Sequence, residues 1–127
     1  RGLVYKNYKW IFPFLSDDKD GFSELYLHLK SILSTTKKNW TVSQDVYDEN
    51  YSFIVIHGIR DLQEIESLKA NQSIKDQLSF EILDNFVTLA SQYRTYLKNK
   101  SWKINQSKQI KLSSNSDGFY LASLSRR

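Results

Sequence analysis

Hydrophobic residues recur with two different periods along the chain, and the changes of period divide it into predicted elements. Residues 8–15 form an aromatic, apolar run that predicts a first strand. Pro13 should lie near the end of that strand or at a bulge, because proline cannot donate to a ladder. From Phe22 the apolar positions follow i, i+3, i+7, i+10 and i+11, the spacing of one helix face. Residues 40–46 then alternate between apolar and polar, as a half-buried antiparallel strand does.

The most hydrophobic stretch, residues 51–59, organises the rest of the prediction. It follows a short turn, so it should form a hairpin with the strand at 40–46. Apolar residues on both faces predict a central position in the sheet. Gly58 is the expected exit from the strand. One face should carry Phe53, Val55, His57 and Ile59, and the other Ile54 and Ile56.

Three further elements complete the predicted order. Asp61, with Glu64 three residues later, is an acidic variant of a capping box and predicts a helix that ends near Ala70. Residues 78–89 are predicted as the fourth strand. Residues 89–100 carry apolar side chains at i, i+4, i+7 and i+8, which predicts a short final helix.

The order strand, helix, strand, strand, helix, strand, helix indicates an α+β fold. It is that of a ferredoxin-like βαββαβ sandwich, here with an extra short C-terminal helix and a basic tail. Right-handed crossovers would place the first and third strands in the middle and both main helices on one face. We expect one domain at residues 1–100. The Ser- and Lys-rich segment 101–127 should be partly ordered, with an edge strand expected at 119–124.

Composition narrows the possible functions. The 127 residues include no Cys, which excludes disulfides, thiolate metal sites and cysteine nucleophiles. Residues 1–97 carry a net charge of −2 and residues 98–127 a net charge of +6. The basic pI therefore belongs to the C-terminal segment, and a nucleic-acid-binding core is not favoured.

The apolar run at 53–59 is far shorter than the ~18 residues of a membrane span, so no span is expected in this chain. Since the chain starts at Arg1 and lacks Met, we expect it to be a piece of a longer protein.

No recognisable catalytic or metal-binding pattern occurs, so we predict no catalytic residues, no metal, no cofactor and no enzyme activity. Three carboxylates at Asp17, Asp18 and Asp20 do not fit the EF-hand spacing, and a solvated loop with Asp20 as helix N-cap is the better interpretation. An enzyme built on His57 and a nearby carboxylate is a less favoured alternative. The carboxylates weighed for it are Asp45, Asp48, Glu49, Glu81 and Asp84.

Exposed aromatic residues are the best candidates for a binding surface. We expect Trp10, Trp40 and Tyr51 on the open face of the sheet, and Trp102 in the C-terminal segment, to contact a partner. Ferredoxin-like sheets can bind RNA through such aromatics. The central strands, however, lack an interleaved Lys/Arg run, so core packing explains their aromatics better.

Several short motifs resemble known envelope proteins. Residues 51–59 followed by Asp61-Leu-Gln-Glu-Ile65 look like a segment of SPOR-like repeats. The opening strand that ends at Pro13, and the close at Asn85-Phe-Val-Thr88 with the Tyr- and Lys-rich helix 93–100, resemble a C-terminal domain of Bacteroidota tetratricopeptide lipoproteins. Those lipoproteins belong to gliding motility and type IX secretion. The chain departs from that family in continuing well beyond the final helix.

The resemblance implies a non-enzymatic interaction or scaffold domain in a larger cell-envelope assembly. The implied location is the periplasm or outer membrane, the implied parent is a lipoprotein, and the implied partners are proteins of an envelope complex. Two alternatives stay open. One is a SPOR-like module that binds peptidoglycan through the sheet face, and the other is a nucleic-acid-binding domain that uses the basic tail.

Overall fold

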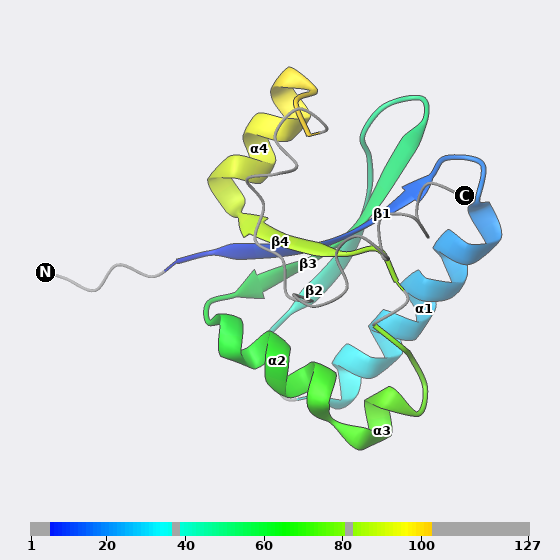
Figure 1. The fold of residues 1–127 in the computed structure, drawn as a ribbon, viewed down its shortest axis with the longest axis vertical. Coiled ribbons are helices and arrows are strands. Elements are labelled where there is room, and N and C mark those ends of the chain that lie inside the picture. The colour runs from blue at the N-terminus through cyan, green and yellow to red at the C-terminus, as the bar shows by residue number, and fades with distance from the viewer. Residues whose placement is uncertain (1–5, 37–38, 81–82, 103–127) are drawn as a thin grey trace, which may run out of the picture.

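The chain folds as an α+β structure around a four-stranded antiparallel sheet, described by a computed structural model for residues 6–36, 39–80 and 83–102. The sheet order is β2-β3-β1-β4, so β1 and β3 are central, as predicted (Figure 1). This arrangement is compatible with a ferredoxin-like α+β fold. The strands are β1 (Tyr8–Leu15), β2 (Thr41–Val46), β3 (Tyr51–Ile59) and β4 (Phe86–Leu89).

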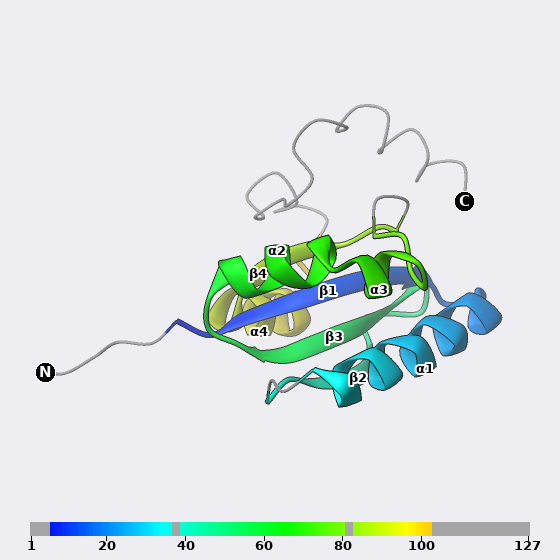
Figure 2. The ribbon, with the colours of Figure 1, turned by 90° about the horizontal axis from the view of Figure 1, so that it is seen from below.

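Helices cover both faces of this sheet. Figures 1 and 2 show one layer on one face and α4 alone on the other. The prediction that the two main helices share a face is confirmed, and the short final helix is α4. The layer on the first face consists of α1 (Lys19–Thr35), α2 (Leu62–Ala70) and the single turn α3 (Gln72–Lys75). On the opposite face, α4 spans Ala90–Asn99.

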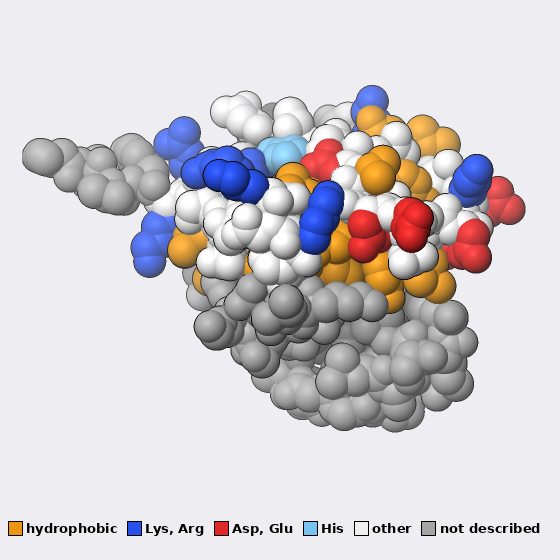
Figure 3. Space-filling model, turned by 90° about the horizontal axis from the view of Figure 1, so that it is seen from above, with side chains coloured by type: hydrophobic (Ala, Val, Ile, Leu, Met, Phe, Trp, Pro, Cys, Tyr) orange, Lys and Arg blue, Asp and Glu red, His pale blue; other side chains and the backbone are white. Residues whose placement is uncertain are grey.

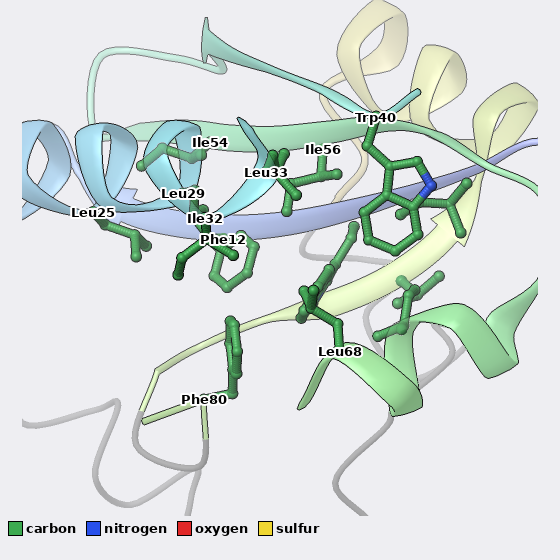
Figure 4. Packing of buried hydrophobic residues seen from close by; sticks show 14 of the residues in the cluster. Phe12, Leu25, Leu29, Ile32, Leu33, Trp40, Ile54, Ile56, Leu68 and Phe80 are labelled. Atoms are coloured by element: carbon green, nitrogen blue, oxygen red, sulfur yellow. The ribbon is translucent and has the colours of Figure 1, made fainter. Parts of the chain in front are cut away.

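The larger core lies between the sheet and α1, α2 and α3. Its floor is formed by even-numbered residues of the two central strands, and Leu29 and Leu68 cover it from α1 and α2 (Figure 4). Trp40 closes one side of the layer. The fully buried floor residues are Trp10, Phe12, Ile54 and Ile56.

A second, smaller core lies between the sheet and α4. Ile11, Phe53 and Val55 form its floor and are fully buried. Tyr96 of α4 packs onto this floor, together with Trp102 beyond the helix. Because the central strands are apolar on both sides, each face needs a covering layer to remove its side chains from water.

Two aspartates begin the main helices. Asp18 caps α1, because its Oδ1 accepts a hydrogen bond from the Gly21 amide at 3.3 Å. The prediction that Asp20 is this cap is wrong, because the helix begins one residue before Asp20 and includes it in its first turn. The cap predicted at Asp61 is confirmed, with its Oδ1 accepting from the Gln63 amide at 3.0 Å.

Gly58 lies inside β3 at a shift of register and does not end the strand. Tyr8 pairs with Ile59 and Trp10 with Ile56, so one extra residue of β3 is accommodated here. Gly58 has φ +94°, and a Cβ at this position would lie 2.9 Å from the Asn39 carbonyl oxygen. The bulge also rotates Ile59 into the larger core, whereas it was predicted to share a face with His57.

The fourth strand is much shorter than predicted. Of the predicted range 78–89, only Phe86–Leu89 pairs with β1 in the described structure, and residues 78–80 and 83–85 belong to no strand. Asn85 organises that loop, because its Nδ2 donates to the carbonyl oxygens of Phe80 and Leu83. Its Oδ1 accepts from Trp10 Nε1 at 3.1 Å, which satisfies the indole of a fully buried tryptophan. Phe80 fills the larger core from this loop.

The described fold continues beyond the domain end predicted at residue 100. Lys100 takes a left-handed conformation (φ 53°, ψ 43°) that ends α4, and Trp102 then turns back into the smaller core. The edge strand predicted at 119–124 falls outside the described residues. None of the helices in the described ranges has the length and apolarity that a bilayer crossing requires.

Trp102 should therefore contribute strongly to stability. Its ring is 2% exposed and makes edge contacts with Phe53 and Tyr51 at centroid distances of 5.1 Å. Replacing Trp102 by Ala should lower the free energy of unfolding by about 3–5 kcal/mol, as for other buried aromatics. Denaturant unfolding measures this loss, and Leu27→Ala, at a position 65% exposed on α1, is the control. Equal stability of the two variants would show that Trp102 does not belong to the core.

Candidate functional site

A row of polar side chains interrupts the apolar α4 side of the sheet at one end. This row consists of Lys9 of β1, His57 of β3, and Ser43 and Asp45 of β2. Lys9 and His57 lie two residues from buried residues of this face, and Ser43 and Asp45 pair with Val55 and Phe53 of the same face. All four are partly exposed. Figure 3 looks onto this side of the molecule, where a histidine lies between Lys/Arg side chains and an acidic side chain.

A chain of hydrogen bonds links these residues to α4. Ser43 Oγ lies 2.7 Å from His57 Nε2 and donates to Asp45 Oδ1 at 3.1 Å. Tyr93 OH donates to Asp45 Oδ2 at 2.6 Å. Both carboxylate oxygens of Asp45 are thus engaged, and one end of α4 is tied to the edge strand of the sheet.

The hydrogen bond from Ser43 to Asp45 limits the roles that His57 can take. Ser43 has a single hydroxyl proton, and that proton points to Asp45. Where the 2.7 Å contact with Ser43 is a hydrogen bond at the same time, Nε2 of a neutral His57 carries the ring proton and donates it. A serine nucleophile needs the opposite arrangement, in which the imidazole accepts the hydroxyl proton. Of the carboxylates weighed for an enzyme built on His57, the structure brings Asp45 close to the ring, with Ser43 between them.

The surroundings shift three proton equilibria. Burial, and then the nearby Lys9 ammonium, lowers the pKa of His57 below its ordinary value, and Asp45 opposes this. Burial and then Arg94 lower the pKa of Lys9. Burial and the bond to Asp45 raise the pKa of the Tyr93 hydroxyl well above its ordinary value. His57 is therefore neutral near pH 7, and Tyr93 stays a donor.

The carboxylates and histidines of the described ranges form no group of three or more that could hold a metal ion. The other carboxylates weighed at the sequence level lie elsewhere. Asp48 accepts from the Asn50 and Tyr51 amides in the β2–β3 turn, Glu49 is exposed in that turn and Asp84 lies in the loop before β4. Glu81 falls outside the described residues.

The four aromatic residues predicted to bind a partner do not form one surface. Trp10 and Trp40 lie in the larger core, 0% and 7% exposed, and Trp102 lies in the smaller core on the other side of the sheet. Only Tyr51 is partly exposed, and it packs against Trp102. Partner binding by these residues stays a prediction, and the described structure leaves only Tyr51 partly accessible for it.

Comparison of the chain with protein-family models, curated proteins and solved structures gave no significant match. The functional argument therefore rests on the geometry of the chain itself.

Acidification should destabilise the fold through His57. The unfolded side chain has a pKa of about 6.5, and the folded value is lower, so the unfolded state binds more protons between the two. The free energy of unfolding should therefore fall as the pH is lowered through about 6.5. His57→Gln should flatten the pH dependence of denaturant midpoints, and His28→Gln on α1 should not. Parallel profiles for wild type and His57→Gln would contradict this assignment.

The contribution of the hydrogen bond between Tyr93 and Asp45 to the free energy of unfolding should be measurable by denaturant unfolding. Tyr93→Phe removes one of the two donors to a partly buried carboxylate, which should lower the free energy of unfolding by about 1–2 kcal/mol. Tyr26→Phe on α1 is the matched control, because no hydrogen bond of its hydroxyl group is found within the described structure. Equal unfolding midpoints for the two variants would show that the Tyr93 bond contributes nothing net.

Proposed function

We propose that this chain is a protein-interaction module that adds a strand from its partner to the free edge of β2. The module would act within a larger assembly. The motifs described above, with their ferredoxin-like and SPOR-like character, favour a non-enzymatic scaffold role in a cell-envelope complex of the periplasm or outer membrane. The observation that supports the proposal is the edge of β2, which pairs with no second strand within the described structure.

β2 forms one edge of the sheet and pairs only with β3 within the described structure. Hydrogen-bonded positions alternate along an antiparallel pair. The Tyr47 amide donates to the Tyr51 carbonyl at 3.1 Å just beyond the strand, in register with the Val46–Ser52 pair. Counting back in steps of two, the backbone groups that point to the free edge are those of Val42, Gln44 and Val46.

Natural edge strands usually carry devices that prevent pairing with other chains, such as Pro, Lys, a bulge or a very short length. The six residues of β2 contain neither Pro nor Lys, and their register with β3 is regular. Val46 adds an apolar side chain that is 75% exposed at the end of this edge. A partner strand would gain main-chain hydrogen bonds along the edge and an apolar contact at Val46.

The opposite edge offers less for such pairing. β4 has four residues, and Leu89 leads directly into α4. The sheet faces are also occupied, one by α1, α2 and α3 and the other by α4 and Trp102. This coverage does not favour peptidoglycan or RNA binding through an open sheet face. The basic tail that would serve nucleic-acid binding falls outside the described residues.

A proline in the edge strand tests the proposal. Gln44→Pro removes a backbone donor that points away from β3, so the domain should still fold, because edge strands tolerate proline at such positions. Losing this donor and the fit around it should weaken partner binding about tenfold. Gln44→Ala, which changes the side chain and keeps the amide, should bind normally. Affinity is measured on the partner captured by a photo-cross-linking residue at position 46 of the full-length protein in its native membranes.

Two outcomes would contradict strand addition. One is a complex that Gln44→Pro and Gln44→Ala affect equally. The other is cross-linking that occurs from position 27 on α1 and not from position 46. The envelope setting is tested separately, because a partner recovered only from a soluble fraction would remove that part of the proposal and leave the edge interaction standing.

A further inference from the structure

Two cationic side chains at the polar end of the α4 side form no ion pair within the described residues. Among the described residues, neither the Lys9 ammonium nor the Arg94 guanidinium forms an ion pair or a side-chain hydrogen bond. Lys9 is partly buried on the central strand β1, where it pairs with Thr88 of β4 and lies beside the bulge at Gly58. A partly buried charge normally has a partner that compensates for the lost hydration.

The fold brings Arg94 to Lys9. The first residue of α4, Ala90, donates its amide proton to the Asn7 carbonyl at 2.8 Å, which fixes the start of the helix beside the start of β1. Arg94 follows one turn later on the same side of the helix. Burial and then Arg94 lower the pKa of Lys9, and Asp45 opposes them by raising it, so both charged groups lie within electrostatic range of Lys9.

His57 can supply a third donor on this surface. Nε2 contacts Ser43 Oγ at 2.7 Å, and in the protonated ring Nδ1 also carries a proton that it can donate. Lys9 lowers the pKa of His57, whereas a bound anion would do the opposite and favour the protonated ring, with Nδ1–H as a new donor.

The one carboxylate facing this group is already engaged. Asp45 accepts from Tyr93 and Ser43 through both oxygens and forms no ion pair with Lys9 or Arg94 within the described residues. The charged groups that face one another here are Lys9 from β1, Asp45 from β2 and Arg94 from α4, and His57 from β3 adds a charge when protonated. The local charge is therefore +1 with His57 neutral and +2 with His57 protonated.

We propose that Lys9, Arg94 and His57 form a binding site for a phosphate group on the α4 side of the sheet. The guanidinium offers paired donors that match phosphate geometry, and the ammonium and imidazolium each add a donor from a different element. A tetrahedral oxyanion can use separate oxygens for the three groups, which a carboxylate with two oxygens cannot. The site goes beyond strand addition, because it lies on the face of the sheet and does not use the backbone of β2.

Histidine NMR provides a direct test, because the chain has two histidines and His28 on α1 is an internal control. The pKa of each ring is measured in chloride and in inorganic phosphate at equal ionic strength. Phosphate should raise the pKa of His57 by about one unit and leave that of His28 unchanged. By linkage, the protein with His57 protonated should bind a phosphate ion of given charge more tightly than the protein with His57 neutral.

Variants then assign the donors. Arg94→Ala, at an exposed position, and Lys9→Met, which keeps the aliphatic stem, should each abolish the phosphate-linked shift of His57. Lys75→Ala on α3, across the sheet, removes an equal charge and should retain it. Lys9→Met should also raise the pKa of His57 in chloride, since it removes the nearby cation. Glycerol 3-phosphate in place of inorganic phosphate shows whether a phosphate carried on a larger molecule fits.

Several results would overturn the site. Equal shifts of His57 and His28 would indicate general screening, and a shift that survives Arg94→Ala would place the anion elsewhere. Acetate producing the same shift as phosphate would refute the choice of ligand. An unchanged His57 pKa in phosphate on the order of 50 mM, far above ordinary metabolite-binding constants, would refute the site itself. Amide resonances of each variant are recorded to establish that it is folded.

Discussion

The structure depends on a central strand that is apolar on both faces. β3 places Ile54 and Ile56 on one side of the sheet and Phe53 and Val55 on the other, and all four are fully buried. Each face must therefore be covered, and the chain supplies α1, α2 and α3 for one face and α4 with Trp102 for the other. Removing either layer would expose a continuous apolar floor, so the two cores depend on each other through one strand.

Covering the second face with one short helix leaves the end of the sheet partly open, and polar residues lie there. Tyr93 crosses from α4 to Asp45 on β2, and Ser43 extends the connection to His57. The chain of hydrogen bonds lets a carboxylate and an imidazole lie next to the smaller core without unsatisfied oxygens. Lys9 and Arg94 are not part of that chain. The hydrogen-bonded residues therefore stabilise the fold, and within the described structure the two cations keep donors that an anion could use.

Much of the fold could be predicted from periodicity, and the errors have local physical causes. β1, β2, β3 and α1 have clear alternating or helical patterns. The fourth strand was predicted too long because Phe80 is apolar although it does not belong to a strand. The hydrogen bonds from Asn85 that hold Phe80 and Leu83 in place produce no periodic pattern in the sequence. Ile59 was placed on the wrong face because a one-residue bulge at Gly58 changes the parity of everything after it. Trp102 follows polar residues, so only the tertiary structure shows that it belongs to the core.

The candidate site was less accessible to such reasoning, because it forms where separate elements cross. Because residues 40–46 alternate, Ser43 and Asp45 fall on one face of their strand, and His57 is the polar side chain predicted on one face of the buried strand. Their proximity to Lys9, however, depends on the order and register of β2, β3 and β1. The position of Arg94 depends on where α4 starts, which the direct Leu89–Ala90 junction and the bond from Ala90 to Asn7 determine. The same placement of α4 removes the sheet face as a flat binding surface. What the described structure leaves open is the edge of β2 and the polar end of the sheet, and these two places offer different chemistry: unpaired backbone groups in one and unpaired positive charge in the other.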